Sequence, residues 1–220
     1  MNFAILGAAS PSAPAGQPLR GMGDLGELAY SIVGDSPIET RIAKLLRAVT
    51  LSLHDPAARA RILRVVSRCP PRDLLCKAGA GLHDLRRAIK YRLDPPDLDR
   101  YPPYMVSIGI GWGDCSAQTI AKMVHDLVCG VDSAGPTTIS QPDPKTGVVG
   151  WNHVYEYAMV NGRRVTSDVS ERAVPLGWEP QRWRIRERRD WIYDVALWER
   201  WYQQGANEHA LPDVSGLYKP

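Results

Sequence analysis

Apolar side chains recur at helical spacing through the first part of the chain. A first helix is expected to begin at Ser36, because Ser36-Pro37-Ile38-Glu39 has the pattern of a capping box with proline at the first helical position. Its apolar face carries Ile38, Ile42, Leu45, Leu46, Val49 and Leu53. Asp55 is suited to cap a second helix, and a third apolar stretch from Leu74 to Ile89 is interrupted by Gly79 and Gly81. Together these segments predict a small helical layer over residues 36–93.

The middle of the chain combines loop-forming residues with one further amphipathic helix. Residues 94–113 contain prolines, tyrosines and glycines, which is typical of a loop. A helix is expected to begin near Cys115 and to end at Gly130, with one apolar face made of Ile120, Met123, Val124, Leu127 and Val128. Residues 131–150 are rich in Pro, Gly and Ser and are expected to form a connecting loop, with a mobile lid as the alternative.

A β-hairpin is predicted over residues 151–168. Two alternating runs flank Asn161-Gly162, which is the strongest short signal for a tight hairpin turn. In the register set by a two-residue loop, Tyr155 faces Asp168, and His153 lies on the same face as Asp168. Their Cβ atoms would then be roughly 6 to 8 Å apart, within reach of a side-chain hydrogen bond. A slip of one residue would remove this pairing.

This order of elements predicts an α+β fold in which a helical layer and a Cys-bearing helix pack on an antiparallel sheet. The domain is expected to span residues 36–174. Residues 1–35, rich in Ala, Pro and Gly, would form an extended N-terminal arm that is disordered or clamps a partner. Residues 175–220 would form a Trp/Arg-rich C-terminal tail. The tail is expected to pack as a helix on its own domain, with nucleic-acid or partner binding as alternatives.

Composition narrows the functional classes. The chain has 220 residues, 44% of them hydrophobic, and a net charge of +3, which does not indicate a nucleic-acid binder. No run approaches the ~18 apolar residues of a membrane span, and the N-terminus lacks the basic start of a signal peptide. The four cysteines show neither the density of a disulfide scaffold nor the spacing of a zinc site. These features favour a soluble protein made in a reducing cytoplasm.

Cys115, His153 and Asp168 are the candidate catalytic residues. Cys115 follows Gly113-Asp114 and opens a helix, where unpaired N–H groups favour a thiolate and could stabilise an oxyanion. An imidazole that accepts the thiol proton, oriented by a carboxylate, completes the group needed for acyl transfer by a thiol. No metal or cofactor is needed for this chemistry.

Four further residues are expected to contact a substrate: Trp112, Gly113, Trp151 and Tyr155. Trp151 is expected to share the face of His153, since it lies two residues before it in a strand. The tryptophans could equally serve as core packing. His125 lies beside the apolar stripe of its helix and is expected to be a flanking residue rather than a ligand. Asp114 is expected to cap the helix.

The arrangement resembles the transglutaminase-like domain of the papain-like cysteine superfamily, in its bacterial and phage form. The resemblance rests on Gly113-Asp114-Cys115 at a helix start, on His153-Val154-Tyr155-Glu156-Tyr157 in a strand, and on a turn followed by a strand ending at Asp168. It covers roughly residues 36–170, including the segment Ile89 to Pro95. The chain departs from the family in Ser116-Ala117-Gln118 after the cysteine and in Val169-Ser170 after the aspartate.

This resemblance implies a thiol enzyme acting on amide or isopeptide bonds of a protein substrate, as a cysteine peptidase or an acyltransferase. It implies Cys115 as nucleophile, His153 as proton shuttle and Asp168 as orienting acid. Members of the family include non-catalytic proteins, so the resemblance also allows a structural or assembly protein of a phage virion, with phage particle proteins as partners.

Overall fold

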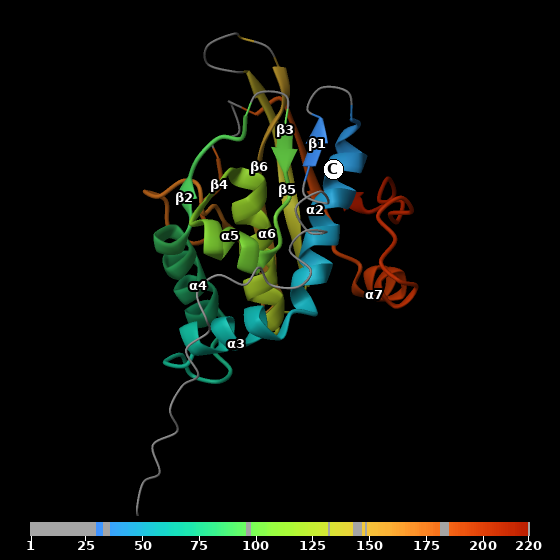
Figure 1. The fold of residues 1–220 in the computed structure, drawn as a ribbon. Helices are drawn as coiled ribbons and strands as arrows, with labels where there is room; N and C mark the ends of the chain where they lie inside the picture. Colours follow the sequence, from blue (N-terminus) through green and yellow to red (C-terminus); the bar gives the residue numbers. More distant parts are fainter. Residues whose placement is uncertain are drawn as a thin grey trace, which may run out of the picture.

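The computed structural model describes residues 30–32, 36–95, 98–131, 133–142, 147, 149–180 and 185–219. The expected N-terminal arm lies outside the described residues except for β1 (Tyr30–Ile32), and so does the basic-aromatic segment 181–184 of the expected tail. Among the described residues, six helices pack on a five-stranded antiparallel sheet (Figure 1). The predicted α+β fold is confirmed.

Three helices form the predicted layer: α2 (Ile38–Leu53), α3 (Pro56–Val65) and α4 (Leu74–Ala88). Asp55 caps α3 as expected, accepting a hydrogen bond from Ala57 N at 2.8 Å. The prediction of a capping box at Ser36 is wrong, because α2 begins at Ile38, its N-cap is Pro37, and no side chain forms a capping hydrogen bond. Glu39 instead forms an ion pair with Arg189, at 3.0 Å.

Helix α4 continues through both glycines that were expected to interrupt it. A Cβ at Gly81 would lie 2.4 Å from ring atoms of His125. Gly81 therefore allows α4 to pack closely on α6 (Cys115–Val128), the helix that carries the candidate nucleophile. Gly130 ends α6 with a positive φ of 88°, as predicted.

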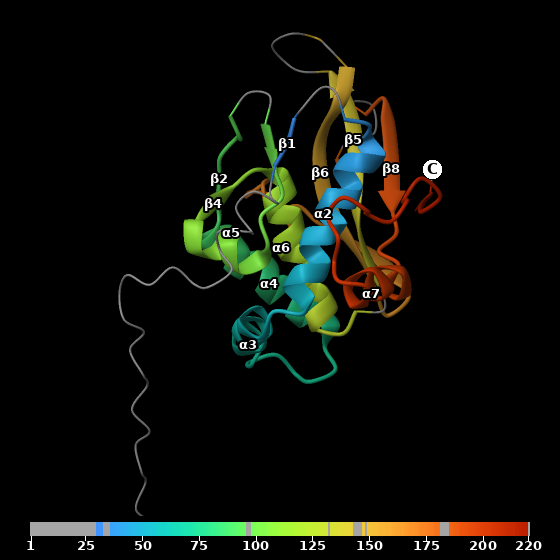
Figure 2. The same ribbon diagram turned by 45° about the vertical axis from the view of Figure 1, so that its right-hand side comes forward.

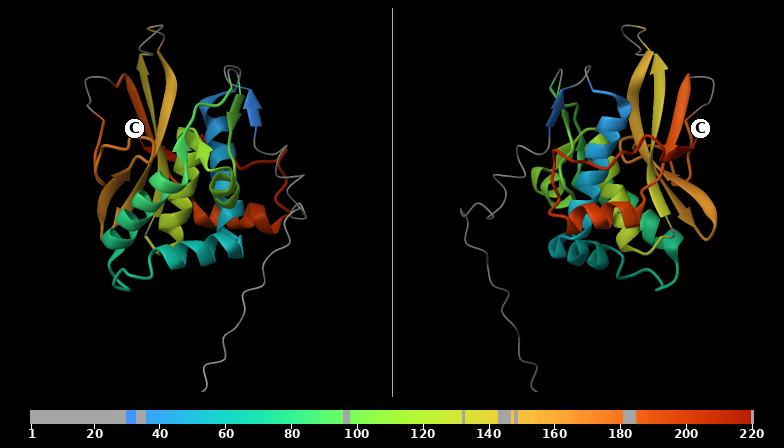
Figure 3. Two further views of the ribbon diagram at one scale, coloured as in Figure 1. Left: turned by 60° about the vertical axis from the view of Figure 1, so that its left-hand side comes forward. Right: turned by 90° about the vertical axis from the view of Figure 1, so that its right-hand side faces the viewer.

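The sheet has the strand order β7-β6-β5-β8-β9, and every pairing in it is antiparallel. Its members are β5 (Ser133–Pro142), β6 (Val149–Val160), β7 (Arg163–Ser167), β8 (Glu187–Trp191) and β9 (Tyr218–Lys219). The helices cover one face of it, as the side views in Figure 3 show. The turned view in Figure 2 shows α2 and α7 beside the sheet.

The expected loop over residues 131–150 is wrong, because β5 is the central strand of the sheet. Its Gly and Pro residues have structural roles in the strand. A Cβ at Gly135 would lie 1.8 Å from the carbonyl oxygen of Trp191, so glycine is required there for close backbone approach. Pro136 has no N–H to donate, and it lies just before the ladder with β8, which begins at Thr137.

The expected loop over residues 94–113 also contains regular structure. β3 (Leu98–Arg100) pairs with β1, α5 (Tyr104–Ile110) forms a short helix, and β4 (Trp112–Gly113) pairs in parallel with β2 (Lys90–Tyr91). These short elements bring β3, α5 and β4 alongside α6.

Residues 187–219 are part of the domain rather than a separate tail. β8 and β9 extend the sheet, and α7 (Val195–Gln203) packs against α2. The side chains of Trp191 and Trp198 are completely buried in the main core. These aromatic rings therefore form part of the same core as the helices and the rest of the sheet.

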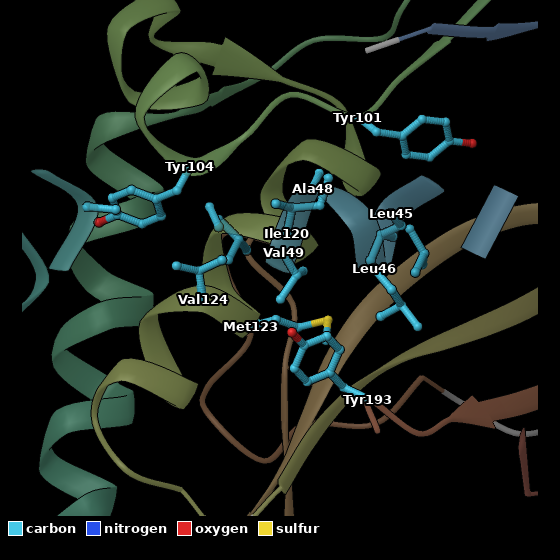
Figure 4. Close-up of a cluster of buried hydrophobic side chains, with 14 of the residues drawn as sticks. Leu45, Leu46, Ala48, Val49, Tyr101, Tyr104, Ile120, Met123, Val124 and Tyr193 are labelled. Carbon is cyan, nitrogen blue, oxygen red and sulfur yellow. The ribbon is translucent and has the colours of Figure 1, made fainter. Parts of the chain in front are cut away.

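The core lies between α6, the sheet and the helices around α6. Figure 4 shows Ile120, Met123 and Val124 of α6 among side chains from α2, with Tyr193 below them. Because α6 is buried along most of its length, its first residue is held in a fixed position relative to the sheet.

Cys69 and Cys76 form a disulfide that closes the α3–α4 connection and that the sequence analysis did not predict. Cys115 and Cys129 are free. Of the described helices, none has both the length and the apolar character needed to cross a bilayer.

Candidate functional site

Cys115 is the first residue of α6, and two neighbours fix its position. Asp114 caps the helix by accepting a hydrogen bond from Ala117 N at 2.9 Å, as predicted. Gly113 lies against the first turn, where a Cβ would come within 2.6 Å of the Ala117 Cβ. Since only glycine fits there, the chain can turn sharply from β4 into α6 and leave Cys115 partly exposed.

His153 and Asp168 meet as the hairpin register predicts. β6 and β7 pair from Val160 opposite Arg163 to Glu156 opposite Ser167, so the expected two-residue turn is correct. His153 Nε2 and Asp168 Oδ2 are 2.7 Å apart. With Nε2 engaged by the carboxylate, Nδ1 is the nitrogen that remains for another partner.

Cys115 and His153 line one open cleft of about 510 Å³. The thiol of Cys115 lies near enough to the imidazole to help raise the pKa of His153. α2 supplies one wall of the cleft with Ile38, Ile42 and Leu45, and Tyr91 and Leu93 supply another. The structure thus brings the three predicted residues together, with His153 between Cys115 and Asp168.

The charges of this group are coupled. Burial lowers the pKa of His153, but the hydrogen bonds to Asp168 and Cys115 and the charges of both groups outweigh it and raise that pKa to about 10. Burial raises the pKa of Asp168, yet the hydrogen bond and charge of His153 bring it below its ordinary value. Both changes favour a protonated imidazole beside an ionised carboxylate at neutral pH.

Asp114 has a different environment. Burial raises the pKa of its carboxyl group to about 7, although hydrogen bonds from the main chain of Ala117 and Ser116 oppose the change. The group that caps α6 therefore titrates near neutral pH beside the candidate nucleophile.

A β-bulge changes the expected position of Trp151. Ile139 pairs with His153, but the next residue of β5, Ser140, pairs with Trp151, so Asn152 is the extra residue in β6. Trp151 and His153 therefore belong to opposite faces of the sheet, and the expectation of a shared face is wrong. Both residues still line the cleft, because His153 lies beyond the last β7 pairing, at a free edge of β6.

The other predicted substrate contacts occupy different positions. The ring of Trp112 lies near two guanidinium groups, with Arg92 and Arg100 at 4.5 and 4.4 Å from its centre, and Trp112 is not among the residues that line the cleft. Tyr155 is only 1% exposed, donates its hydroxyl to Glu179 at 3.1 Å and lies beside the His153 ring. Tyr155 therefore packs against the His153 ring and does not line the cleft.

Several site residues were missed by sequence reasoning. Arg41 of α2 reaches across the cleft to Asp99, at 2.7 Å, and to the carbonyl oxygen of Trp151, at 3.2 Å. Arg86 of α4 donates to the carbonyl oxygens of Asp168 and Glu171, at 2.7 and 2.6 Å. The only signal for either was a charged residue next to the apolar stripe of a helix, which most helices contain.

A second cavity of about 380 Å³ reaches His153 from another side. It is lined by Ile139, Gln141, His153, Asp168, Glu171, Trp178 and Pro180. His153 is thus the residue shared by two hollows, of which one contains Cys115 and the other contains Asp168.

His125, expected at the flank of the apolar stripe of α6, is completely buried, with Nδ1 3.1 Å from Asp126 Oδ1. It belongs to a buried charged group with Lys122 and Glu156 under the sheet. Within the part of the chain that the structure describes, there is no cluster of three or more His, Cys, Asp or Glu residues that could hold a metal ion.

Comparison with known proteins gives one distant structural likeness. A crystal structure from Parabacteroides distasonis, described as a "putative protease", aligns with 60% of this chain and 26% of its own chain, at 11% identity and a TM-score of 0.45. The match therefore spans about a quarter of that protein. No protein-family model and no curated protein sequence matches the chain.

Proposed function

We propose that this protein is a transglutaminase-like thiol enzyme that acts on amide or isopeptide bonds of a protein substrate. The observation that supports it best is the position of His153, which is bonded to Asp168 at 2.7 Å and lines the same open cleft as Cys115. A thiol, an imidazole and a carboxylate in this order are the groups that acyl transfer by a cysteine requires.

The proposed first step is attack of the Cys115 sulfur on the substrate carbonyl carbon. His153 holds the thiol proton, and Asp168 stabilises the resulting imidazolium and fixes the ring so that Nδ1 faces the sulfur. The carbon–nitrogen bond of the substrate then breaks, and His153 gives its proton to the leaving amine. A thioester on Cys115 remains.

The second step releases the acyl group. Water or a primary amine attacks the thioester while His153 accepts a proton from the attacking group, and the sulfur leaves as the thiolate. Water gives hydrolysis and an amine gives a new amide bond. The dimensions of the cleft, about 510 Å³, suit a side chain or a short peptide segment of a protein.

The test is selective alkylation of Cys115 with iodoacetamide at pH 7, followed by peptide mass spectrometry. Cys115 is expected to react at least about 10-fold faster than the buried Cys129, and His153→Ala is expected to lower the Cys115 rate at least about 10-fold. The matched control is His209→Ala, which removes a histidine whose side chain is 88% exposed, outside the cleft.

Equal rates for Cys115 and Cys129, or no effect of His153→Ala, would overturn the proposal. In that event the cleft would be a binding surface without acyl-transfer chemistry, as a structural or assembly protein would have.

A further inference from the structure

Tyr91 is a partly exposed tyrosine that lines the cleft. Its hydroxyl has no hydrogen-bond partner among the described residues. The other tyrosine of the cleft, Tyr101, donates to Asp99 at 3.0 Å. The hydroxyls of four more tyrosines are likewise paired: Tyr104, Tyr155, Tyr157 and Tyr193. An unpaired phenol in a cleft is a donor that remains free for a ligand.

The main chain holds Tyr91 beside the candidate nucleophile. Tyr91 pairs with Gly113 in the parallel β2–β4 ladder, two residues before Cys115. The bonds from Lys90 N to Gly111 O, at 3.0 Å, and from Arg92 N to Gly113 O, at 2.9 Å, flank this pairing. Ile89, just before β2, is completely buried and anchors the strand to the core. The phenol is therefore attached to a fixed backbone and shares the cleft with Cys115.

The electrostatic surroundings keep this phenol protonated. Partial burial raises the pKa of Tyr91, and the negative charges of Cys115 and Asp114 raise it further. A phenol that retains its proton acts as a hydrogen-bond donor toward developing negative charge in the cleft.

The main-chain N–H groups of α6 supply only part of what an oxyanion needs. Sequence alone suggested that several free N–H groups at this helix start would be available. In the structure, the Asp114 carboxylate accepts from Ala117 N at 2.9 Å. That donor is directed at the cap, so the helix start offers fewer free N–H groups than expected, and a side chain can supply a second donor beside the N–H of Cys115.

We propose that Tyr91 is a catalytic residue that donates its O–H to the oxyanion formed when Cys115 attacks a carbonyl group. This inference rests on the proposed function. As the carbon–sulfur bond forms, the carbonyl electron pair moves to oxygen, and the Tyr91 hydroxyl and the Cys115 N–H stabilise that charge. When the leaving group departs, the pair returns to form the thioester carbonyl. Tyr91 keeps its proton throughout.

The assignment also orients the substrate. With the carbonyl oxygen toward Tyr91, the leaving group must lie toward His153, which protonates it. Tyr91 and His153 thus contact opposite sides of the reacting carbon.

Two probes separate this role from thiol activation. p-Nitrophenyl acetate acylates Cys115 through an oxyanion and releases p-nitrophenolate, whereas iodoacetamide alkylates the same sulfur by direct displacement of iodide without one. Tyr91→Phe is expected to lower the acylation rate about 10- to 100-fold, as loss of one oxyanion donor does. The alkylation rate is expected to stay within about twofold, since Tyr91 does not hold the thiol proton.

Tyr157→Phe is the matched control, because it removes a hydroxyl outside the cleft that is already bonded to the carbonyl oxygen of Trp191. It should alter neither rate. Loss of acylation and alkylation to the same degree in Tyr91→Phe would overturn the role, and so would no loss of either.

Failure of the proposed function gives a different result. In that case the wild-type protein itself alkylates Cys115 no faster than Cys129, and both the function and the role of Tyr91 are rejected. Rapid, His153-dependent alkylation combined with unchanged acylation in Tyr91→Phe rejects the role of Tyr91 alone.

Discussion

Asp168 uses one carboxylate oxygen for His153 and the other for the loop that follows it. Oδ2 lies 2.7 Å from His153 Nε2, while Oδ1 accepts from Ser170 Oγ at 2.6 Å and from Ser170 N at 3.0 Å. The hydrogen bonds from Ser170 therefore fix the orientation of the carboxylate that faces the imidazole. This relationship makes the ionisation of His153 depend on a particular loop conformation.

Replacing Asp168 with Asn should lower the pKa of His153 from about 10 toward its ordinary value of 6.5, because the hydrogen bond to a charged partner is lost. The measurement is an NMR titration of the His153 ring. Ser170→Ala should cause a smaller decrease, since it keeps the carboxylate charge and removes only its support. An unchanged His153 titration in Asp168→Asn would contradict the observed pairing.

The free energy of unfolding should depend on pH through the ionisation of the His153 ring. The pKa of His153 is raised in the folded state, to about 10 from 6.5, so the stabilisation is fully present below pH 6.5. It is lost as the pH rises from 6.5 through about 10, because the folded state must then give up its proton. Urea unfolding of the wild type and of His153→Gln should show a free-energy difference that shrinks between pH 6 and pH 10. A difference independent of pH would contradict this linkage.

Asp126 and Glu156, the two buried carboxyl groups near Lys122, should contribute unequally to the free energy of unfolding. Lys122 Nζ lies 2.5 Å from Asp126 Oδ2 with both side chains buried, so Asp126→Ala removes the closest partner of a buried ammonium group and leaves only Glu156, at 3.9 Å. We expect a loss of about 3–5 kcal/mol in the free energy of unfolding. Urea titration monitored by tryptophan fluorescence measures it.

Glu156 offers the matched comparison. Its pKa is raised well above the ordinary value, mainly by burial, which favours the protonated side chain. Glu156→Gln keeps the shape and the neutral state and should change the stability by less than about 1 kcal/mol. A large loss in Glu156→Gln would show that Glu156 is ionised in the folded protein.

The Cys69–Cys76 bridge should stabilise the fold without serving the site. It closes a loop with a sequence separation of 7, for which chain entropy predicts about 2 kcal/mol. The double variant Cys69→Ser/Cys76→Ser should lose about that much and keep the iodoacetamide rate of Cys115, since the bridge lies outside the cleft. Thiol counting in denaturant should find two free thiols in the wild type; four would mean that the bridge is not formed.

Close backbone approach at the centre of the sheet should make Gly135 intolerant of a side chain. Gly135→Ala would place a Cβ 1.8 Å from the Trp191 carbonyl oxygen, which forces β5 and the end of β8 apart. We expect a loss of at least about 2 kcal/mol in the free energy of unfolding. Gly150→Ala, where nothing lies within 4 Å of the added Cβ, is the control and should be nearly neutral.

Local sequence patterns determined most of the helical layer and the hairpin. Apolar spacing located α2, α3, α4 and α6 because each buries one face, and Asn161-Gly162 set the β6–β7 register because its turn geometry admits few alternatives. The His153–Asp168 pair followed directly, since both residues lie within reach of that turn.

The strands that pair over long distances escaped prediction. β5 carries Gly135 and Pro136, which locally indicate a loop, and β8 begins in a run of charged residues. Their pairing depends on partners far away in the chain, and the packing gained by that pairing outweighs the local preferences. The bulge at Asn152, which moves Trp151 to the other face of the sheet, also cannot be predicted from β6 alone, because it depends on the pairing with β5.

The sequence by itself determined which residues carry the candidate chemistry and how two of them pair, because turns, caps and apolar periodicity act over a few residues. Only the tertiary structure decided that Cys115 and Tyr91 line the same cleft as His153. The reason is physical: the start of α6 is positioned by burial of the whole helix between the sheet and α2, and Tyr91 by a β2–β4 pairing across more than twenty residues. Neither contact is encoded in any short segment of the chain.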